Sequence, residues 1–526
     1  MLYLLTQAVD RAAARDAAHA AIRFQGRTLT YGDLAQRSNQ LARVLIEYGV
    51  RRGDRVGIFM PKRIESAIAI HGIMKAGAAY VPLDPTAPPA RIAFILRDCG
   101  IRHVVTEPGR LSVLANATAE HGALVAAIGV SDAQGSAAEA IGWDEVHSAS
   151  DATPDAGTME QDLSYILYTS GSTGVPKGVM HTHRSALSFA EIAVREYGLR
   201  ADDRLSNHAP LHFDLSTLDY FAGALAGATT VIIPESHTKL PASLSKLIEE
   251  ESLTVLYAVP FALLQLLLHG ALARRDFSAL RWVLFGGEPF PPKHLRALME
   301  VLPAARFVNV YGPTEVNGVT HYPIPALIEE DTPIPIGTPY GNVEMMIVDE
   351  NDDPVAPGET GLLLVRTPTM MRGYWGRPDL NARAFYRRPA FDLYEDTFHR
   401  TGDLVRLRPD GNLDFLGRKD RQIKTKGYRV ELDEVEAALL QHADVEAAAA
   451  FPVANGEGSQ RIEAAVTLRR PGSVVAAELV RHAASHLPTY AIPERIAVLT
   501  EFPRTSTDKI DRIRLQAMAA ELSGLA

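Results

Sequence analysis

Cysteine is almost absent from this sequence: Cys99 is the only one in 526 residues. A single cysteine excludes an intramolecular disulfide and a cysteine-based zinc site, and it suits a reducing compartment. Long hydrophobic runs are missing as well, because no stretch reaches the roughly 18 apolar residues of a membrane span. The first residues lack the basic segment of a secretory signal and soon reach Asp10 and Arg11. Together these absences predict a cytoplasmic protein.

Positive charge is in short supply too. The chain has 53 Lys and Arg against 63 Asp and Glu, so its formal net charge is -10. Nucleic acids and anionic membranes are bound through basic patches, and we therefore expect neither as a partner. The length exceeds that of a typical single core, which predicts at least two domains.

Alternating strand and helix patterns indicate parallel βαβ units along most of the chain. Short apolar runs that predict buried strands lie at 56–60, 229–233, 254–259, 282–285 and 307–311, and Pro241 begins a predicted helix at 241–250. Shorter strands and turns follow from about residue 340. Past residue 421, strands at 447–453 and 461–468 mix with helices at 431–440 and 475–486. The Ala/Gly/Ser-rich residues 131–142 predict a surface loop.

These patterns predict the fold class and the domain boundary. We expect an α/β large N-terminal domain at 1–420, built of βαβ subdomains plus a β-rich subdomain. We expect a small α+β C-terminal domain at 421–526.

One glycine- and hydroxyl-rich stretch is the most informative of the chain. Residues 168–178 read Tyr-Thr-Ser-Gly-Ser-Thr-Gly-Val-Pro-Lys-Gly. Glycines allow turns that expose successive N–H groups, such rows bind anions, and Lys177 adds a point charge suited to phosphate. The pattern is not a Walker A motif, because Pro176 precedes the lysine and Gly178 follows it. A flexible surface loop is the alternative interpretation. A nicotinamide dehydrogenase is disfavoured, since no Gly-x-Gly-x-x-Gly follows a strand.

Five further motifs accompany this loop in a fixed order. They lie at 286–289 (Gly-Gly-Glu-Pro), 309–315 (Asn-Val-Tyr-Gly-Pro-Thr-Glu), 399–403 (His-Arg-Thr-Gly-Asp), 417–424, and 503–504 with 508–509. Together the motifs resemble those of the adenylate-forming superfamily of acyl-CoA synthetases, luciferases and nonribosomal-peptide adenylation domains. The resemblance covers almost the whole chain. It implies an ATP-dependent enzyme that joins a carboxylate to the α-phosphate of ATP and expels pyrophosphate.

The resemblance also assigns roles to individual residues. Glu315 would carry Mg²⁺, Thr314 would meet the α-phosphate, and Lys509 would bridge that phosphate and the carboxylate during adenylation. The other residues implied for ATP are Thr169, Ser170, Ser172, Thr173 and Lys177 for the β- and γ-phosphates; Asn309 and Tyr311 for adenine; Asp403 and Arg418 for the ribose; and Gly286, Gly287, Glu288 and Gly312 around them. Taken singly, Asp403 could be a turn former, Tyr311 a core residue and Lys509 a solvated charge.

Asp420 falls at the hinge position of the family. Two half-reactions at one site need two arrangements, and a hinge allows the tail to rotate between them. We expect this rotation to remove Lys509 and to open a tunnel for a thiol.

Asp214 is the candidate receptor for a substrate ammonium group. It follows Phe213, as in the amino-acid-activating branch of the family, and a buried carboxylate needs such a partner. A helix N-cap is the alternative. The pocket expected by motif alignment comprises Asp214, Leu215, Leu218, Tyr257, Leu284, Gly286, Val310, Gly318, Val319 and Lys509. No charge other than those of Asp214 and Lys509 occurs in it, so charged substrate side chains are disfavoured.

Several substrates and functions stay open at this stage. The run Asp-Leu-Leu-Tyr-Leu resembles that of freestanding prolyl adenylation enzymes, which favours proline or another small apolar amino acid. Glycine at 286 and 318 is expected to enlarge the pocket and could admit a β-amino acid such as 3-aminobutyrate, a macrolactam starter unit. An acyl-CoA synthetase and a non-catalytic nucleotide-binding regulator are the remaining alternatives.

The thiol acceptor is expected to come from another molecule. The sequence shows no carrier-domain motif, so the acceptor would be a separate phosphopantetheinylated carrier protein or coenzyme A.

Overall fold

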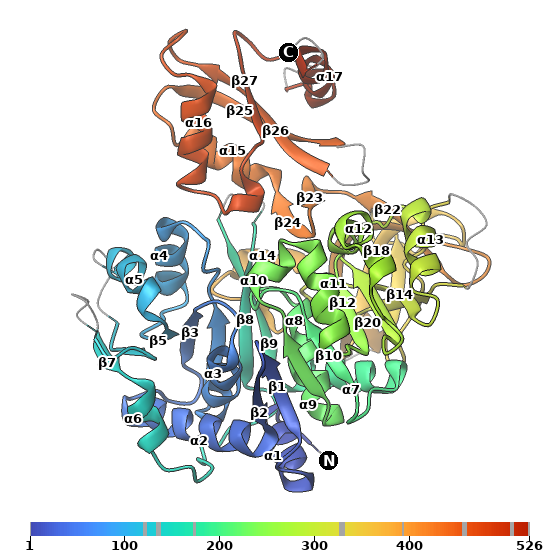
Figure 1. Cartoon of the computed structure of the whole chain (residues 1–526). Helices are drawn as coiled ribbons and strands as arrows, with labels where there is room; N and C mark the ends of the chain where they lie inside the picture. Colours follow the sequence, from blue (N-terminus) through green and yellow to red (C-terminus); the bar gives the residue numbers. More distant parts are fainter. Residues whose placement is uncertain are drawn as a thin grey trace. The chain divides into compact units, whose positions relative to one another are not determined.

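The computed structural model describes residues 2–118, 124–132, 138–171, 175–325, 332–391, 394–454, 460–504 and 510–523. The chain divides into two compact units, which we call the large unit and the small unit. The large unit comprises Met1–Pro85, Ile95–Tyr168 and Gly178–Lys419. The small unit comprises Thr86–Phe94, Thr169–Lys177 and Asp420–Ala526. Figure 1 colours the chain from its N-terminus in blue to its C-terminus in red.

One sheet of the large unit is built around the strands that flank the glycine-rich loop. In the described part of the chain it has eight strands, in the order β19-β9-β8-β4-β3-β5-β6-β7. The pairings from β8 through β4, β3, β5 and β6 to β7 are parallel, as the βαβ pattern predicts. The strands are β19 (Gly373–Tyr374), β9 (Lys177–Thr182), β8 (Leu163–Thr169), β4 (Ala79–Pro82), β3 (Arg55–Phe59), β5 (His103–Thr106), β6 (Ala126–Ile128) and β7 (Glu139–Ile141).

The other large sheet places pocket candidates next to one another. Among the described residues its order is β16-β15-β14-β13-β12-β10-β11-β1-β2. Strands β12, β13 and β14 are parallel, and their register sets Tyr257 beside Leu284 and Gly286 beside Val310. The strands are β16 (Thr338–Pro339), β15 (Thr320–Pro323), β14 (Arg306–Tyr311), β13 (Trp282–Gly286), β12 (Val255–Ala258), β10 (Arg204–Asn207), β11 (Thr229–Ile232), β1 (Ala20–Phe24) and β2 (Arg27–Thr30).

An antiparallel sheet forms the predicted β-rich subdomain. Strand β21 (Tyr394–Leu407) pairs with β22 (Leu413–Arg418), and this register sets Asp403 opposite Arg418. The other strands of this sheet are β17 (Glu344–Val348), β18 (Thr360–Arg366) and β20 (Phe385–Phe391).

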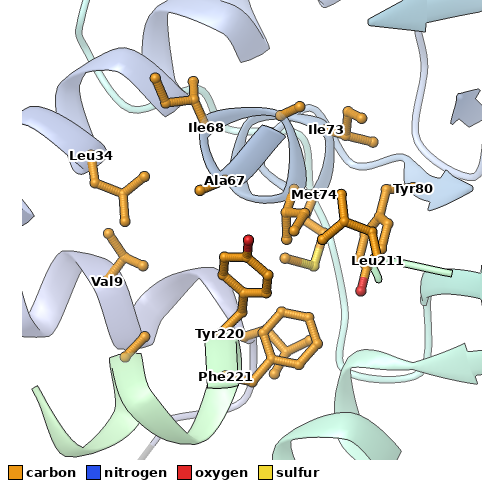
Figure 2. Close-up of a cluster of buried hydrophobic side chains, with 14 of the residues drawn as sticks. Val9, Leu34, Ala67, Ile68, Ile73, Met74, Tyr80, Leu211, Tyr220 and Phe221 are labelled. Atoms are coloured by element: carbon orange, nitrogen blue, oxygen red, sulfur yellow. The ribbon is translucent and has the colours of Figure 1, made fainter. Parts of the chain in front are cut away.

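The main core of the large unit surrounds helix α3 (Ile64–Lys75), all of whose residues except Glu65 are buried. Helix α2 (Tyr31–Glu47) packs beside it and begins at a capping box of Thr30 and Asp33. Figure 2 shows Tyr220 and Phe221 next to Met74 of α3. Both aromatics belong to a π-helical segment, Leu218–Ala222, that directly follows the short helix α8 (Leu215–Thr217). The core therefore supports the segment that carries Leu218.

The small unit is an α+β domain. Strands β25 (Val445–Ala454), β26 (Gln460–Leu468) and β27 (Arg495–Leu499) form one sheet, and β23 (Gln422–Thr425) pairs with β24 (Tyr428–Glu431). Helices α15 (Leu432–Leu440) and α16 (Ala476–Ala484) complete its core, and α17 (Arg512–Ser523) packs on β25.

The predicted fold class is confirmed, and the expected strands and helices lie within a few residues of their predicted bounds. The loop expected at 131–142 is wrong in part, because β7 occupies Glu139–Ile141 at the edge of the first sheet. No helix within the described ranges is long and apolar enough to cross a bilayer.

Candidate functional site

Three candidates from separate motifs meet in one buried cluster. Arg418 donates to Asp403 Oδ1 at 2.6 Å, and the Tyr311 hydroxyl donates to Asp403 Oδ2. The Asp403 N–H donates to Thr401 Oγ1 at 3.1 Å. Burial, with the charge of Asp403 next, raises the pKa of Tyr311 well above its usual value, so this hydroxyl stays a donor. A carboxylate has about four acceptor positions, so a further pair of hydroxyls can be accommodated.

The neighbouring motifs supply tight backbone. A side chain at Gly286 would meet the carbonyl of Val310 at 2.2 Å, and one at Gly312 would meet the carbonyl of Asn317 at 1.5 Å. Gly287 has a φ of 99°, a conformation that favours glycine. These glycines let the chain approach itself closely beside Tyr311.

Two candidates in these motifs make internal contacts. The Asn309 carboxamide donates to the carbonyl of Pro335 at 2.8 Å. The Glu288 carboxylate accepts the N–H of Phe261 at 2.9 Å, in the first turn of helix α12 (Pro260–His269). A carboxylate there is favoured by the helix dipole, so Glu288 contributes to structure.

Thr314 and Glu315 are held by two residues that the motifs did not reveal. Ring nitrogen Nε2 of His181 lies 2.8 Å from the carbonyl of Thr314, and the Tyr374 hydroxyl donates to Glu315 Oε1 at 2.8 Å. Burial lowers the pKa of His181 to about 4, so its imidazole is neutral at pH 7. Because a carbonyl only accepts, the neutral ring carries its proton on Nε2 and donates it to Thr314. No local pattern signals these contacts, since β9 and β19 bring His181 and Tyr374 from distant parts of the sequence.

The phosphate-loop candidates are described in part. Ser172, Thr173 and the catalytic candidate Lys509 lie outside the described residues. Ser170 is buried, and the buried hydroxyl of Thr169 makes no hydrogen bond within the described ranges. A side chain at Gly171 would meet the carbonyl of Val175 at 2.0 Å, so the loop folds tightly on itself. An unsatisfied buried hydroxyl in a tight glycine loop fits a phosphate.

The described residues also fit a magnesium ion that is bound together with phosphates. Glu315 supplies a buried carboxylate, and no group of three or more His, Cys, Asp or Glu able to hold a metal occurs in the described ranges. Mg²⁺ is usually held by one or two carboxylates plus substrate phosphates, so Glu315 alone is a suitable protein ligand. The hinge candidate Asp420 is the first residue of the main segment of the small unit, and its carboxylate accepts the N–H of Gln422.

Most of the apolar pocket candidates belong to the main core of the large unit. Leu218, Tyr257, Leu284 and Val310 are buried in a single cluster, against which Leu215 packs. Asp214 is half-buried at the N-cap of α8, yet its side chain makes no capping hydrogen bond there. Burial, with the Asp214 charge next, raises the pKa of both Tyr165 and Tyr257. The charge of Asp214 therefore acts on two buried tyrosines.

The two glycines do not enlarge the pocket as expected. The space beside Gly318 is filled, because a side chain there would meet the ring of Phe189 at 2.6 Å and that of Tyr340 at 3.3 Å. At Gly286 the neighbouring strand backbone occupies the space. Val319 is buried in a different cluster, with Tyr311 and the β-rich subdomain.

The large unit also contains a buried polar network that no sequence motif indicates. Lys62 donates to the carbonyls of Asn207 and His208 at 2.6 and 2.7 Å, and Asn207 donates to Asp219 at 3.1 Å. Burial lowers the pKa of Lys62 to about 7 and raises that of Asp219 well above its usual value. Because Asp219 lies in the π-helical segment, this network fixes the chain that follows Asp214 and Leu215.

Comparisons with known proteins agree with this geometry. The family model described as AMP-binding enzyme matches residues 9–375, and that of the AMP-binding enzyme C-terminal domain matches residues 434–509. An L-proline--[L-prolyl-carrier protein] ligase of Pseudomonas fluorescens is 35% identical over 94% of this chain and 95% of its own length. A relative of the same description from Streptomyces coelicolor is 36% identical over 93% of this chain and 91% of its own. The solved amide bond synthetase McbA from Marinactinospora thermotolerans superposes with a TM-score of 0.85 and 26% identity, over 98% of this chain and 99% of that one.

Proposed function

Because the chain belongs to the AMP-binding enzyme family and is an ATP-dependent, AMP-forming ligase, we propose that it activates a small apolar amino acid, with proline favoured. The aminoacyl group then passes to the phosphopantetheine thiol of a separate carrier protein. Relatives from two genera carry this activity in their names, at 35% and 36% identity over most of the chain.

The observation that carries the proposal is the setting of Asp214. Asp214 begins α8 without capping it, and its charge acts on the buried Tyr165 and Tyr257. The next residue, Leu215, packs against the core cluster that contains Tyr257, Leu284 and Val310. A carboxylate in such surroundings gains most from a cationic partner, and an amino acid brings an ammonium group. Apolar side chains such as these would accept a small apolar substrate side chain and would leave a charged one unpaired.

The proposed reaction has two steps, adenylation and thioester formation. A carboxylate oxygen of the amino acid attacks the α-phosphorus of ATP, the bond to the β-phosphate oxygen breaks, and pyrophosphate leaves. The thiolate of the carrier then attacks the acyl carbon of the aminoacyl-AMP, and AMP leaves with the electron pair.

Residues of this chain orient both substrates. Asp403, Tyr311 and Arg418 would hold the nucleoside, while Thr169, Ser170 and Lys177 would hold the phosphates. Bound Mg²⁺, through Glu315, would neutralise charge on the phosphate oxygens. Lys509 and Thr314 would stabilise charge that develops at the α-phosphate.

The β-amino acid alternative requires space beside Gly286 and Gly318. Backbone or aromatic rings occupy that space, which disfavours this alternative. An acyl-CoA synthetase stays as the alternative that pyrophosphate exchange separates, whereas membership of the ligase family disfavours a non-catalytic regulator.

The decisive experiment is ATP–pyrophosphate exchange against a panel of acids. The panel holds L-proline, L-alanine, L-valine, 3-aminobutyrate, and cyclopentanecarboxylate as a proline analogue without an amine. We expect exchange with proline above the others and little with the amine-free acid. Exchange with the amine-free acid alone would indicate an acyl-CoA synthetase, and no exchange with any amino acid of the panel would contradict the proposed substrate class.

Asp214→Ala tests how the amine is recognised. The substitution would leave the ammonium group of bound proline without its charge partner. Such a loss costs about 3–5 kcal/mol of binding free energy, so exchange with proline should fall by a factor of about 100 or more. Asp202→Ala is the matched control, because Asp202 is an exposed aspartate of the same unit. Equal activity of the two variants would contradict the role of Asp214.

Asp420→Pro tests the hinge. Fixing the backbone at this residue should spare pyrophosphate exchange and suppress thioester formation, measured with a phosphopantetheinylated carrier protein and with coenzyme A. An equal loss of both half-reactions would contradict a hinge at Asp420, and thioester formation with coenzyme A alone would contradict a carrier as acceptor.

A further inference from the structure

Tyr374 contacts the carboxylate that the proposed function assigns to Mg²⁺. Its hydroxyl donates to Glu315 Oε1 at 2.8 Å, and both side chains are buried, with exposed fractions of 6% and 1%. We infer that Tyr374 is a positioning residue that fixes the direction in which Glu315 presents its carboxylate to the divalent cation bound with ATP. This inference rests on the proposed function of Glu315.

The backbone around Tyr374 is anchored to the strand that leaves the phosphate loop. Strand β19 pairs with β9, which begins at Lys177, and sets Tyr374 opposite Val179. The N–H groups on either side of β19 donate to the same strand: Arg372 to the carbonyl of Met180 and Trp375 to that of Gly178, each at 2.8 Å. Tyr374 therefore has little freedom to move along or away from β9.

Asn381 and Gly373 fix the direction of the tyrosine further. The Tyr374 N–H donates to Asn381 Oδ1 at 2.7 Å, and the Asn381 amide donates back to the Tyr374 carbonyl at 3.2 Å. Gly373 has a φ of 142°, and a side chain there would meet Asn381 Oδ1 at 2.9 Å. The turn that directs Tyr374 toward Glu315 thus requires glycine at this position.

The segment 371–374 donates two hydrogen bonds to Glu315. The Met371 N–H donates to the Glu315 carbonyl at 2.7 Å, while the Tyr374 hydroxyl bonds the carboxylate. His181 of β9 donates a hydrogen bond to the carbonyl of the preceding residue, Thr314. Backbone and side chain of the Thr314–Glu315 pair are thus held by β9 and the segment next to it.

A hydrogen bond to a charged acceptor is stronger than a neutral one and constrains the carboxylate plane. Partners that orient a metal ligand typically change metal affinity or activity by about 10- to 100-fold when removed. The tyrosine acts through Glu315, so its loss should weaken cation binding and leave nucleoside binding intact.

The test is Tyr374→Phe, which keeps the ring and removes the hydroxyl. Mn²⁺ replaces Mg²⁺ as the probe, and its affinity is measured by electron paramagnetic resonance in the presence of a non-hydrolysable ATP analogue. We expect Mn²⁺ to bind about 10-fold more weakly than to the parent enzyme. The deficit of Tyr374→Phe in pyrophosphate exchange should shrink as Mg²⁺ is raised. Binding of AMP without metal should be unchanged, which also checks that the variant is folded.

Tyr31→Phe is the matched control. The Tyr31 hydroxyl is buried and donates to the carbonyl of Ala228 at 2.6 Å, so this variant loses a comparable hydrogen bond away from Glu315. Its Mn²⁺ affinity should equal that of the parent.

Glu315→Gln separates the proposed role of Glu315 from the inferred role of Tyr374. If Glu315→Gln weakens Mn²⁺ binding and Tyr374→Phe does not, the inference about Tyr374 is overturned while the role of Glu315 stands. If neither variant changes Mn²⁺ affinity, the proposed role of Glu315 fails and the inference fails with it.

Discussion

Asp403 is buried and receives hydrogen bonds from both Tyr311 and Arg418, whereas Asp214 is half-buried and does not cap the helix that it begins. The first carboxylate joins two segments of the β-rich subdomain to the end of β14. The charge of the second acts on two buried tyrosines, and the residue that follows it packs against the main core.

This difference separates stability from recognition. Asp403 pairs with the mostly buried side chain of Arg418 within the protein, so a change there should affect folding and nucleotide binding together. Asp214 is proposed to pair with the substrate, so a change there should affect the reaction far more than the fold. The predictions that follow test this contrast at both ends of the site.

Asp403→Asn should have the largest effect on stability. The substitution removes the charge of Asp403 from its ion pair with Arg418, whose side chain is 12% exposed. Breaking such a largely buried pair costs about 3–5 kcal/mol of unfolding free energy. Urea unfolding of the parent and the variant measures it. Arg406→Ala is the control, because Arg406 pairs with Asp414 in the same hairpin at a more exposed place, worth up to about 1 kcal/mol. Similar losses for the two variants would remove the contrast.

Acid should destabilise the core around helix α3. His71 of α3 packs edge-on against Phe221, and burial lowers its pKa to about 3. The unfolded state takes up a proton near pH 6.5 and the folded state does not, so stability is retained above pH 6.5 and is lost as the pH falls. The expected loss is about 2 kcal/mol at pH 5 and about 3 kcal/mol at pH 4.

His71→Gln isolates this effect. Unfolding free energies of the parent and the variant, measured from pH 7 to pH 4, should converge as the pH falls, because only the parent loses the His71 contribution. Parallel curves would show that His71 does not titrate as described. His269→Gln, at an exposed histidine of the same unit, should keep the parent's dependence.

The residues expected to bind the nucleotide could be predicted from the sequence, because each lies in a recognisable motif. Tyr311, Asp403 and Arg418 occur in separate motifs, and the structure brings them into one cluster. The supporting residues could not be named in this way. Tyr374 reaches Glu315 only because β19 pairs with β9, and a pairing of such distant segments leaves no local periodicity to read.

The pocket end shows a second limit of sequence reasoning. A glycine reveals a missing side chain but not what fills the space, and at Gly318 aromatic rings from two distant segments do so. No sequence motif marks Lys62 as a buried residue, yet its amine donates hydrogen bonds to two backbone carbonyls inside the large unit. Strand β7 was missed because it is a three-residue edge strand beside a stretch rich in Ala, Gly and Ser.

Gly318→Ala tests which account of the pocket is right. If the ring of Phe189 fills the space, the added methyl group overpacks the core and should cost about 1–3 kcal/mol of unfolding free energy. A glycine that merely enlarged the pocket would give a variant of unchanged stability and altered KM for the amino acid. Gly109→Ala is the control, because a side chain there meets only Glu107 at 3.9 Å.

The smallest expected effect concerns the tyrosine pair behind Gly318. The hydroxyls of Tyr197 and Tyr340 share a hydrogen bond of 2.5 Å, and both side chains are buried. Tyr197→Phe or Tyr340→Phe alone should each cost about 1 kcal/mol, since each leaves the other hydroxyl without this partner. The double variant should cost clearly less than the sum of the two, because it removes both polar groups together.

A double-mutant cycle by urea unfolding measures this coupling, and KM for the amino acid is followed in the same four proteins. Coupled stabilities with an unchanged KM would place the pair in the supporting core, in line with the core cluster that contains Tyr257, Leu284 and Val310. Additive stabilities would contradict the shared hydrogen bond. A changed KM would instead extend the substrate pocket to Tyr340 and reduce the contrast between the two ends of the site, since both would then recognise ligands through buried polar groups.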